Sequence, residues 1–147
     1  MRILHTSDWH LGRTFLSESM HSHQEVFVDW LLELVAIERV ELIVIAGDVY
    51  DRAVPPAESV RLFNRALVDV SAVCPVFVTP GNHDSAIRLG FGSELMRTNG
   101  VHIRSEISEI NVPLEIRGSD GTNLVVYGIP YLQPEVVFNE LESERSH

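Results

Sequence analysis

Apolar runs with β character alternate along this chain with amphipathic helical segments, and this alternation restricts the fold more than any other feature. We predict strands over three β-branched or aliphatic runs, Arg2–Ser7, Glu41–Ala46 and Val76–Thr79. Apolar residues recur at helical spacing over residues 26–35 and again over residues 60–70. Strands that alternate with helices form β-α-β units with right-handed crossovers. The alternation therefore predicts an α/β fold with a mainly parallel sheet and flanking helices.

Local signals predict where the helices begin. The sequence Ser22-His-Gln-Glu25 matches a capping box, which would start the first helix. Pro55-Pro56 leads into a second helix over residues 57–71. A third helix is expected over residues 85–98.

The pattern then changes, and three short strands are expected. They cover Val101–Ile103, Val112–Ile116 and Asn123–Tyr127, with a turn at Ser119-Asp-Gly121 between the last two. We expect these strands to begin a second sheet layer.

Composition limits the class of protein. The chain has 147 residues and a hydrophobic content of 45%, which suits one domain with one core. No apolar run approaches the ~20 residues needed to cross a bilayer, and no leader-like segment precedes the first strand. We therefore expect a cytoplasmic protein with no membrane association.

Charge bears on the substrate. The net charge is −10, and all eleven basic residues are arginines. A phosphate-rich polymer is repelled by this average charge, so a nucleic-acid substrate would need metals and local arginines to offset it. The alternative is that the carboxylates only keep the surface soluble.

Three motifs follow the predicted strands directly: Asp8-Trp-His10, Gly47-Asp-Val-Tyr-Asp51 and Gly81-Asn-His-Asp84. The carboxyl ends of parallel strands meet at one edge of a sheet, so these side chains should converge there. Each motif alone can also serve a turn or a cap. The three together, in order, favour a site that binds two metal ions.

The residue types suit particular ions. Carboxylate, imidazole and amide donors fit Mn²⁺, Mg²⁺, Fe²⁺ or Zn²⁺. Asp8 and His10 leave the same face of an extended segment and can grip one ion. Asp48 is the natural bridge between two ions roughly 3.5–4 Å apart. Asn82 can hold the second ion without adding charge.

The wider sequence around these motifs resembles the calcineurin-like metallophosphoesterase superfamily. The resemblance rests on four segments: His5–Arg13, Ala46–Arg52, Gly81–Ser85 and Gly128–Tyr131. It runs from Met1 to about Glu135, and the Asp-Trp-His-Leu-Gly piece is typical of the superfamily's bacterial DNA-repair nucleases. The resemblance implies a sheet sandwich with helices outside.

The resemblance also implies roles at the site. Asp8 and His10 would bind the first metal ion, Asn82 would bind the second, and Asp48 would bind both. Mn²⁺ is the foremost candidate ion. His83 would face the scissile phosphate and stabilise the transition state or protonate the leaving oxygen, with Asp84 orienting its ring. Asp51 would support the ligands without touching metal. The implied reaction is attack of an activated water on a DNA phosphodiester.

Four further residues are candidates near the site. His5, inside the first predicted strand, is expected to be a buried, hydrogen-bonded support of the metal loop rather than a ligand. Arg13, Arg52 and Arg88 follow the three motifs closely and are candidates for contacting the DNA backbone. Ordinary salt bridging to the many carboxylates is the equal alternative for these arginines.

The family pattern also predicts what this sequence lacks. Complete members carry further histidines downstream in defined motifs, including Gly-His-x-His, and no such motif occurs here. We therefore expect residues 1–147 to be the N-terminal part of a metallophosphoesterase domain, with weak metal binding and poor DNA hydrolysis on their own.

Partners follow from the same resemblance. It implies DNA, an ATPase subunit with a long coiled coil, and a homodimer through the helices at residues 57–71 and 85–98. Leu62, Phe63 and Leu95 are candidates for the dimer seam, although core packing explains the same positions. Two alternatives stay open: a phosphoesterase acting on nucleotides or phosphoproteins, and a non-catalytic fragment that only dimerises or binds a partner.

Overall fold

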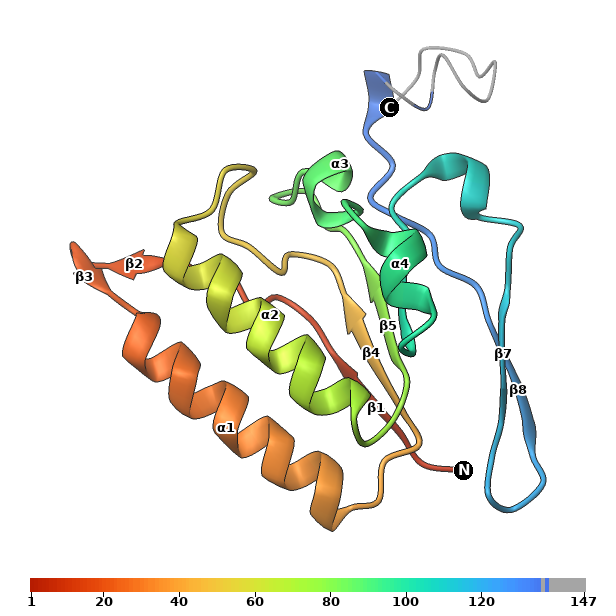
Figure 1. Cartoon of the computed structure of the whole chain (residues 1–147). Helices are drawn as coiled ribbons and strands as arrows, with labels where there is room; N and C mark the ends of the chain where they lie inside the picture. Colours follow the sequence, from red (N-terminus) through yellow and green to blue (C-terminus); the bar gives the residue numbers. More distant parts are fainter. Residues whose placement is uncertain (136, 138–147) are drawn as a thin grey trace.

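A four-stranded parallel sheet forms the centre of the molecule (Figure 1). The computed structural model describes residues 1–135 and 137. The strand order is β1-β4-β5-β6. The strands are β1 (Ile3–Thr6), β4 (Leu42–Ala46), β5 (Val76–Thr79) and β6 (Val101–Ile103). The prediction of an α/β fold around a mainly parallel sheet is confirmed.

The position of β6 corrects one expectation. Val101–Ile103 does not begin the second layer, because it pairs in parallel with β5, with Phe77 opposite His102. Val101 and Ile103 are 4% and 2% exposed and belong to the main core. The chain between β5 and β6 is helical, so this strand completes another β-α-β unit of the first sheet.

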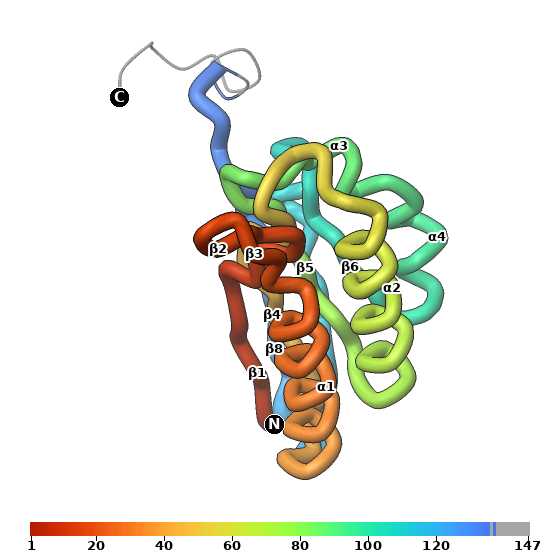
Figure 2. The backbone as a smooth tube through the Cα atoms, turned by 90° about the vertical axis from the view of Figure 1, so that its left-hand side faces the viewer, coloured from red at the N-terminus to blue at the C-terminus, as the bar shows by residue number. Residues whose placement is uncertain are grey.

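Two long helices cover one face of the sheet. They are α1 (His21–Ile37) and α2 (Ala57–Ser71), which lie side by side (Figures 1 and 2). α1 buries Val28, Leu31 and Val35. α2 buries an apolar stripe against the same core: Leu62, Phe63, Ala66, Leu67 and Val70. The apolar residues at helical spacing in both segments are therefore the ones that pack against this face of the sheet.

The start of α1 differs from the predicted capping box. The helix begins at His21, after Met20, whose side chain makes no cap bond; Ser19 Oγ instead accepts the His21 N–H over 3.3 Å. Ser22 is exposed inside the first turn. The amide of Gln24 instead bonds to the loop that follows β1.

The predicted helix over residues 85–98 is two short helices. These are α3 (Ala86–Leu89) and α4 (Ser93–Arg97). Gly92, the N-cap residue of α4, has φ 75°, a left-handed conformation that glycine adopts readily and that a continuous helix does not contain. At Gly90 a Cβ would lie 2.2 Å from Ser105 Oγ, so the backbone approaches that segment too closely for any side chain.

An antiparallel hairpin covers part of the other face. It consists of β7 (Leu114–Arg117) and β8 (Asn123–Val126). Leu114 packs with Leu42 and Phe77 in a second, smaller core cluster. The expected second layer therefore begins at this hairpin. A short 3₁₀ turn, η1 (Ile107–Glu109), precedes it, and a small hairpin of β2 (Thr14–Phe15) and β3 (Glu18–Ser19) precedes α1. None of the described helices is long and apolar enough to span a membrane.

Candidate metal centre

Three loops meet where β1, β4 and β5 end. Asp8 N–H donates to Gly47 O over 3.1 Å, and His10 N–H donates to Asp48 O over 2.9 Å. Gly47 N–H donates to Thr79 O over 2.9 Å. These bonds continue the pairing of the parallel strands beyond the sheet. These backbone bonds fix the three loops against one another.

Unusual backbone conformations cluster in these loops. Asp8, His10 and Asp48 have φ values of 56°, 43° and 49°, in the left-handed region. Each such conformation costs roughly 1–3 kcal/mol in a residue other than glycine, and strain of this kind is concentrated at functional sites. All three residues are the predicted metal ligands.

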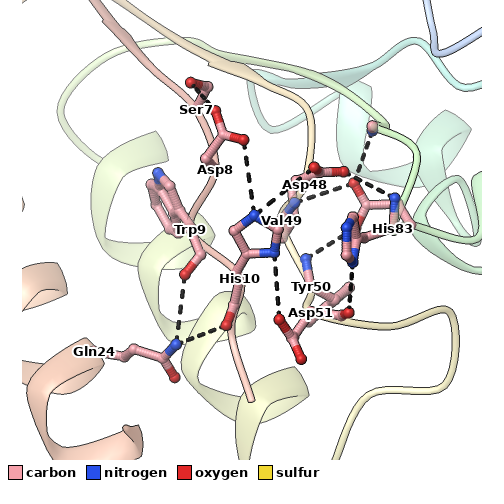
Figure 3. Close-up of polar contacts among 12 residues, drawn as sticks. Ser7, Asp8, Trp9, His10, Gln24, Asp48, Val49, Tyr50, Asp51 and His83 are labelled. Atoms are coloured by element: carbon pink, nitrogen blue, oxygen red, sulfur yellow. Dashed lines mark hydrogen bonds and ion pairs between the residues drawn. The ribbon is translucent and has the colours of Figure 1, made fainter. Parts of the chain in front are cut away.

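The spacing of their side chains suits a shared cation (Figure 3). His10 Nε2 lies 3.8 Å from Asp8 Oδ1 and 3.8 Å from Asp48 Oδ2. Both distances are too long for hydrogen bonds. Each pair can nevertheless lie within the ~2.0–2.2 Å that nitrogen and oxygen ligands keep from an ion such as Zn²⁺. Ligand atoms of His10, Asp48 and His83 also lie within 4.8 Å of one another. The donor set therefore fits a divalent cation.

Asn82 lies at the same site. Asp8, Asp48 and Asn82 line one open cavity of about 310 Å³, with Gly47 and Gly81 between them. A Cβ on Gly81 would lie 2.1 Å from Asp48 Oδ1. The structure thus brings all four predicted metal ligands together, and it needs glycine at position 81 to do so.

His83 stands beside this cavity with one ring nitrogen engaged. Its Nδ1 lies 2.8 Å from the backbone oxygen of Asp51. Since a carbonyl only accepts, Nδ1 carries the proton of that bond and Nε2 is left for another partner. The bond to Asp51 raises the pKa of His83, and the carboxylates of Asp48, Asp51 and Asp84 act in the same direction.

The predicted role of Asp84 as the residue that orients the His83 ring is wrong. Its carboxylate accepts backbone N–H groups from Val49 at 3.1 Å, Tyr50 at 2.9 Å and Gly81 at 2.9 Å. Burial raises the pKa of Asp84, while these three donors oppose the shift. Asp84 therefore ties the loop after β4 to the loop after β5, and the Asp51 carbonyl holds the His83 ring.

Asp51 also approaches the site through its side chain. Asp51 Oδ1 lies 3.4 Å from His10 Nδ1. A carboxylate beside the outer nitrogen of a ligating imidazole fixes the orientation of the ring. At 3.4 Å this contact is an ion pair rather than a hydrogen bond, so the supporting role of Asp51 stays a prediction.

The expectation for His5 is wrong. His5 is exposed, not buried. It lies opposite Val44 on the face that carries the β7–β8 hairpin, but β1 is an edge strand that the hairpin leaves open. The neighbouring Ile3 on the same face is 45% exposed for the same reason.

The three candidate arginines are all exposed. Arg88 donates from Nη1 to Ala53 O over 3.3 Å. Among the described residues, no carboxylate forms an ion pair with Arg13, Arg52 or Arg88. The salt-bridge alternative therefore finds no support among those residues.

Sequence reasoning missed Gln24, which bonds to the loop carrying Asp8 and His10. The only feature of the sequence that pointed to this contact was a polar residue near the start of a predicted helix. The position of Gln24 on the helix does not determine which loop its side-chain amide contacts.

This arrangement of loops and ligands defines a metallophosphoesterase. Residues 1–145 match the calcineurin-like phosphoesterase family, so the chain belongs to that family. It is similar to the SbcD subunit of the nuclease SbcCD from Escherichia coli (strain K12), with 38% identity over 136 residues, or 91% of this chain and 34% of the relative. The corresponding protein of Staphylococcus saprophyticus is 31% identical over 144 residues, covering 97% of this chain and 36% of the relative. The chain thus spans about a third of the length of these curated relatives.

Proposed function

We propose that this chain is the N-terminal catalytic part of an SbcD-like, metal-dependent DNA nuclease. The observation that carries the proposal is the convergence of carboxylate and amide donors on one cavity of about 310 Å³, with the His10 imidazole 3.8 Å from Asp8 and from Asp48, two residues that line it. The names of the relatives describe nucleases and so support a nucleic acid as the substrate; within that class, the resemblance of the motifs to those of DNA-repair nucleases favours DNA.

In this proposal Asp8 and His10 bind one cation, Asp48 bridges and Asn82 binds the second. When bound, a pair of divalent cations polarises the phosphodiester and supplies a nucleophilic water near neutral pH. Mn²⁺ is the foremost candidate, with Mg²⁺, Fe²⁺ and Zn²⁺ as alternatives. The second ion has two protein ligands in this proposal, so a longer chain that resembles the relatives in length would supply more.

His83 acts on the substrate rather than on the cations. Its Nδ1–H is committed to Asp51 O, which leaves Nε2 to face a phosphate oxygen. A protonated Nε2 can stabilise charge on the phosphate or donate its proton to the leaving oxygen. Asp84 contributes by fixing two loops, and Asp51 by fixing both His83 and His10.

Arg13, Arg52 and Arg88 contact the DNA backbone in this proposal. They are exposed, and a chain of net charge −10 needs local cations to hold a polyanion. DNA as the substrate also implies action in the cytoplasm.

Two partners belong to the proposal. The relatives are subunits of SbcCD, which supports an SbcC-type ATPase as the partner. For a homodimer, the predicted seam residues Leu62 and Phe63 are wrong, because they are 4% and 3% exposed in the core. The third predicted seam residue, Leu95, is 78% exposed and stays in the proposal, where Ile87 at 88% and Phe91 at 82% join it.

The test compares substrates and one variant. The purified chain is assayed with Mn²⁺ on linear double-stranded DNA and on bis(p-nitrophenyl) phosphate, and Mn²⁺ binding is measured by calorimetry. We expect slow but Mn²⁺-dependent DNA cleavage by this chain, because its ligand set for the second ion is small, and a further fall of about 10²–10⁴-fold in His83→Ala with Mn²⁺ affinity retained.

Other outcomes would favour the alternatives. Full activity of His83→Ala contradicts its role. Hydrolysis of only the small diester favours a phosphoesterase acting on nucleotides or phosphoproteins. Failure to bind Mn²⁺ or to cleave either substrate favours a non-catalytic fragment.

A further inference from the structure

The side chain of Gln24 joins helix α1 to the loop that carries Asp8 and His10 (Figure 3). Its Nε2 donates to His10 O over 2.7 Å and lies 3.5 Å from Trp9 O. Its Oε1 accepts the Gly12 N–H over 3.1 Å. A single amide therefore bonds the backbone on both sides of Leu11, as a neighbouring strand would.

This contact falls where the loop is strained. His10 has φ 43° and Gly12 has φ 93°. On its other side the loop is held by His10 N–H to Asp48 O and by Leu11 N–H to Val49 O, both 2.9 Å. Gln24 closes the second side, so the unfavourable conformation of His10 is fixed from both directions.

We infer that Gln24 is a positioning residue for the metal loop. It sets the backbone of His10 so that the imidazole Nε2 stays between the carboxylates of Asp8 and Asp48. The inference rests on the proposed function, since it assigns Gln24 a role at the proposed cation site. Residues that orient metal ligands in this way typically change metal affinity by about 10–100-fold when replaced.

The chemistry requires an amide. The position needs a donor for His10 O and an acceptor for Gly12 N–H at a fixed separation. Glutamate has the same shape but lacks the donor, and it would set a carboxylate oxygen against the His10 carbonyl. Methionine has a similar length and offers neither strong group.

Charge and positioning predict opposite changes in the cation affinity of Gln24→Glu. Gln24→Glu adds a negative charge near a cation site, and Coulomb attraction alone would tighten cation binding. A positioning role predicts weaker binding. The matched control is His23→Glu, which adds the same charge at the exposed neighbouring position of the same helix.

The experiment has one readout without metal and one with it. In the metal-free chain, NMR measures hydrogen exchange of the Gly12 amide and the ring signals of His10. We expect Gly12 exchange to rise about tenfold in Gln24→Met, as the loss of one hydrogen bond predicts. With Mn²⁺, calorimetry should show affinity about 10-fold lower in Gln24→Glu and Gln24→Met, and not lower in His23→Glu.

The outcomes separate this inference from the proposed function. An unchanged chain that binds no Mn²⁺ contradicts the proposed function. Unchanged Gly12 exchange and His10 signals in Gln24→Met contradict the role of Gln24, whatever the chain binds. Tighter Mn²⁺ binding by Gln24→Glu, equal to that of His23→Glu, also overturns it. Circular dichroism confirms folding, and Gln24→Glu keeps the acceptor for Gly12 if Gln24→Met unfolds.

Discussion

Gly81 is the residue whose size matters most at the site. An added Cβ would lie 2.1 Å from Asp48 Oδ1 and 2.3 Å from Asp48 N. We expect Gly81→Ala to lower the free energy of unfolding by about 1–3 kcal/mol, as overpacking does, and to weaken Mn²⁺ binding by displacing the bridging carboxylate. Urea unfolding and calorimetry measure the two effects.

Gly121→Ala is the control for Gly81. Gly121 has a left-handed φ of 83° but nothing within 4 Å of an added Cβ. This change should cost stability through backbone strain alone, about 1 kcal/mol, and leave Mn²⁺ affinity intact. Equal Mn²⁺ affinities of Gly81→Ala and the unchanged chain would show that the contact with Asp48 does not set the site.

The buried phenol of Tyr50 makes the stability of the fold depend on pH. Burial, with a smaller contribution from the Asp84 carboxylate, raises the pKa of Tyr50 from 10.0 to about 12. Since the folded state favours the neutral phenol, this stabilising contribution is complete below pH 10 and is lost as the pH rises through about 12. An ultraviolet titration of tyrosinate should contain a component near pH 12 that Tyr50→Phe removes. Its persistence in that variant would contradict the prediction, and Tyr127→Phe is the exposed control.

At the scale of elements, the segment from α3 to α4 exposes three large apolar side chains, which are called its apolar edge below. Ile87, Phe91 and Leu95 recur at intervals of four and are each more than three-quarters exposed. If this edge forms the proposed homodimer, Phe91→Glu combined with Leu95→Glu should convert a dimer to a monomer, because charge is costly in an apolar interface. Light scattering after size-exclusion chromatography measures the mass. Ile37→Glu, on the exposed end of α1, is the control, and a dimer that survives the double change would exclude this edge.

The elements that position the site could be predicted from the sequence. Buried parallel strands are continuous apolar runs, so β4 and β5 were evident from Glu41–Ala46 and Val76–Thr79. Their order along the chain then required the three following loops to meet. Composition and helical spacing were also enough for α2, whose predicted bounds of 57–71 agree with the structure.

Contacts that depend on loop geometry could not be predicted. The Asp84 carboxylate bonds three backbone N–H groups instead of His83, and which donors lie in reach is decided by loop positions that no spacing encodes. His5 is exposed because its strand lies at the edge of the sheet. Local signals also fail where backbone segments approach closely, as Gly90 and Ser105 do at the break between α3 and α4.

At the scale of the whole molecule, a net charge of −10 means that the proposed DNA binding would depend on a few arginines. We expect the double change Arg52→Ala and Arg88→Ala to weaken binding of a DNA duplex and to reduce the slope of log affinity against log salt by about 2, one for each phosphate contact. Fluorescence anisotropy over a salt series measures both. Arg65→Ala is the control, because Arg65 pairs with Asp29 at 3.0 Å between α1 and α2. An unaltered slope in the double variant would remove these arginines from the DNA contact.

The backbone bonds between the three loops have a kinetic consequence. They fix the backbone of Asp8, His10 and Asp48, three of the proposed metal ligands. Capture of a cation then requires little rearrangement of the chain. The slow event becomes the removal of water from the arriving ion, so uptake should differ among metals according to how readily each gives up its hydration shell.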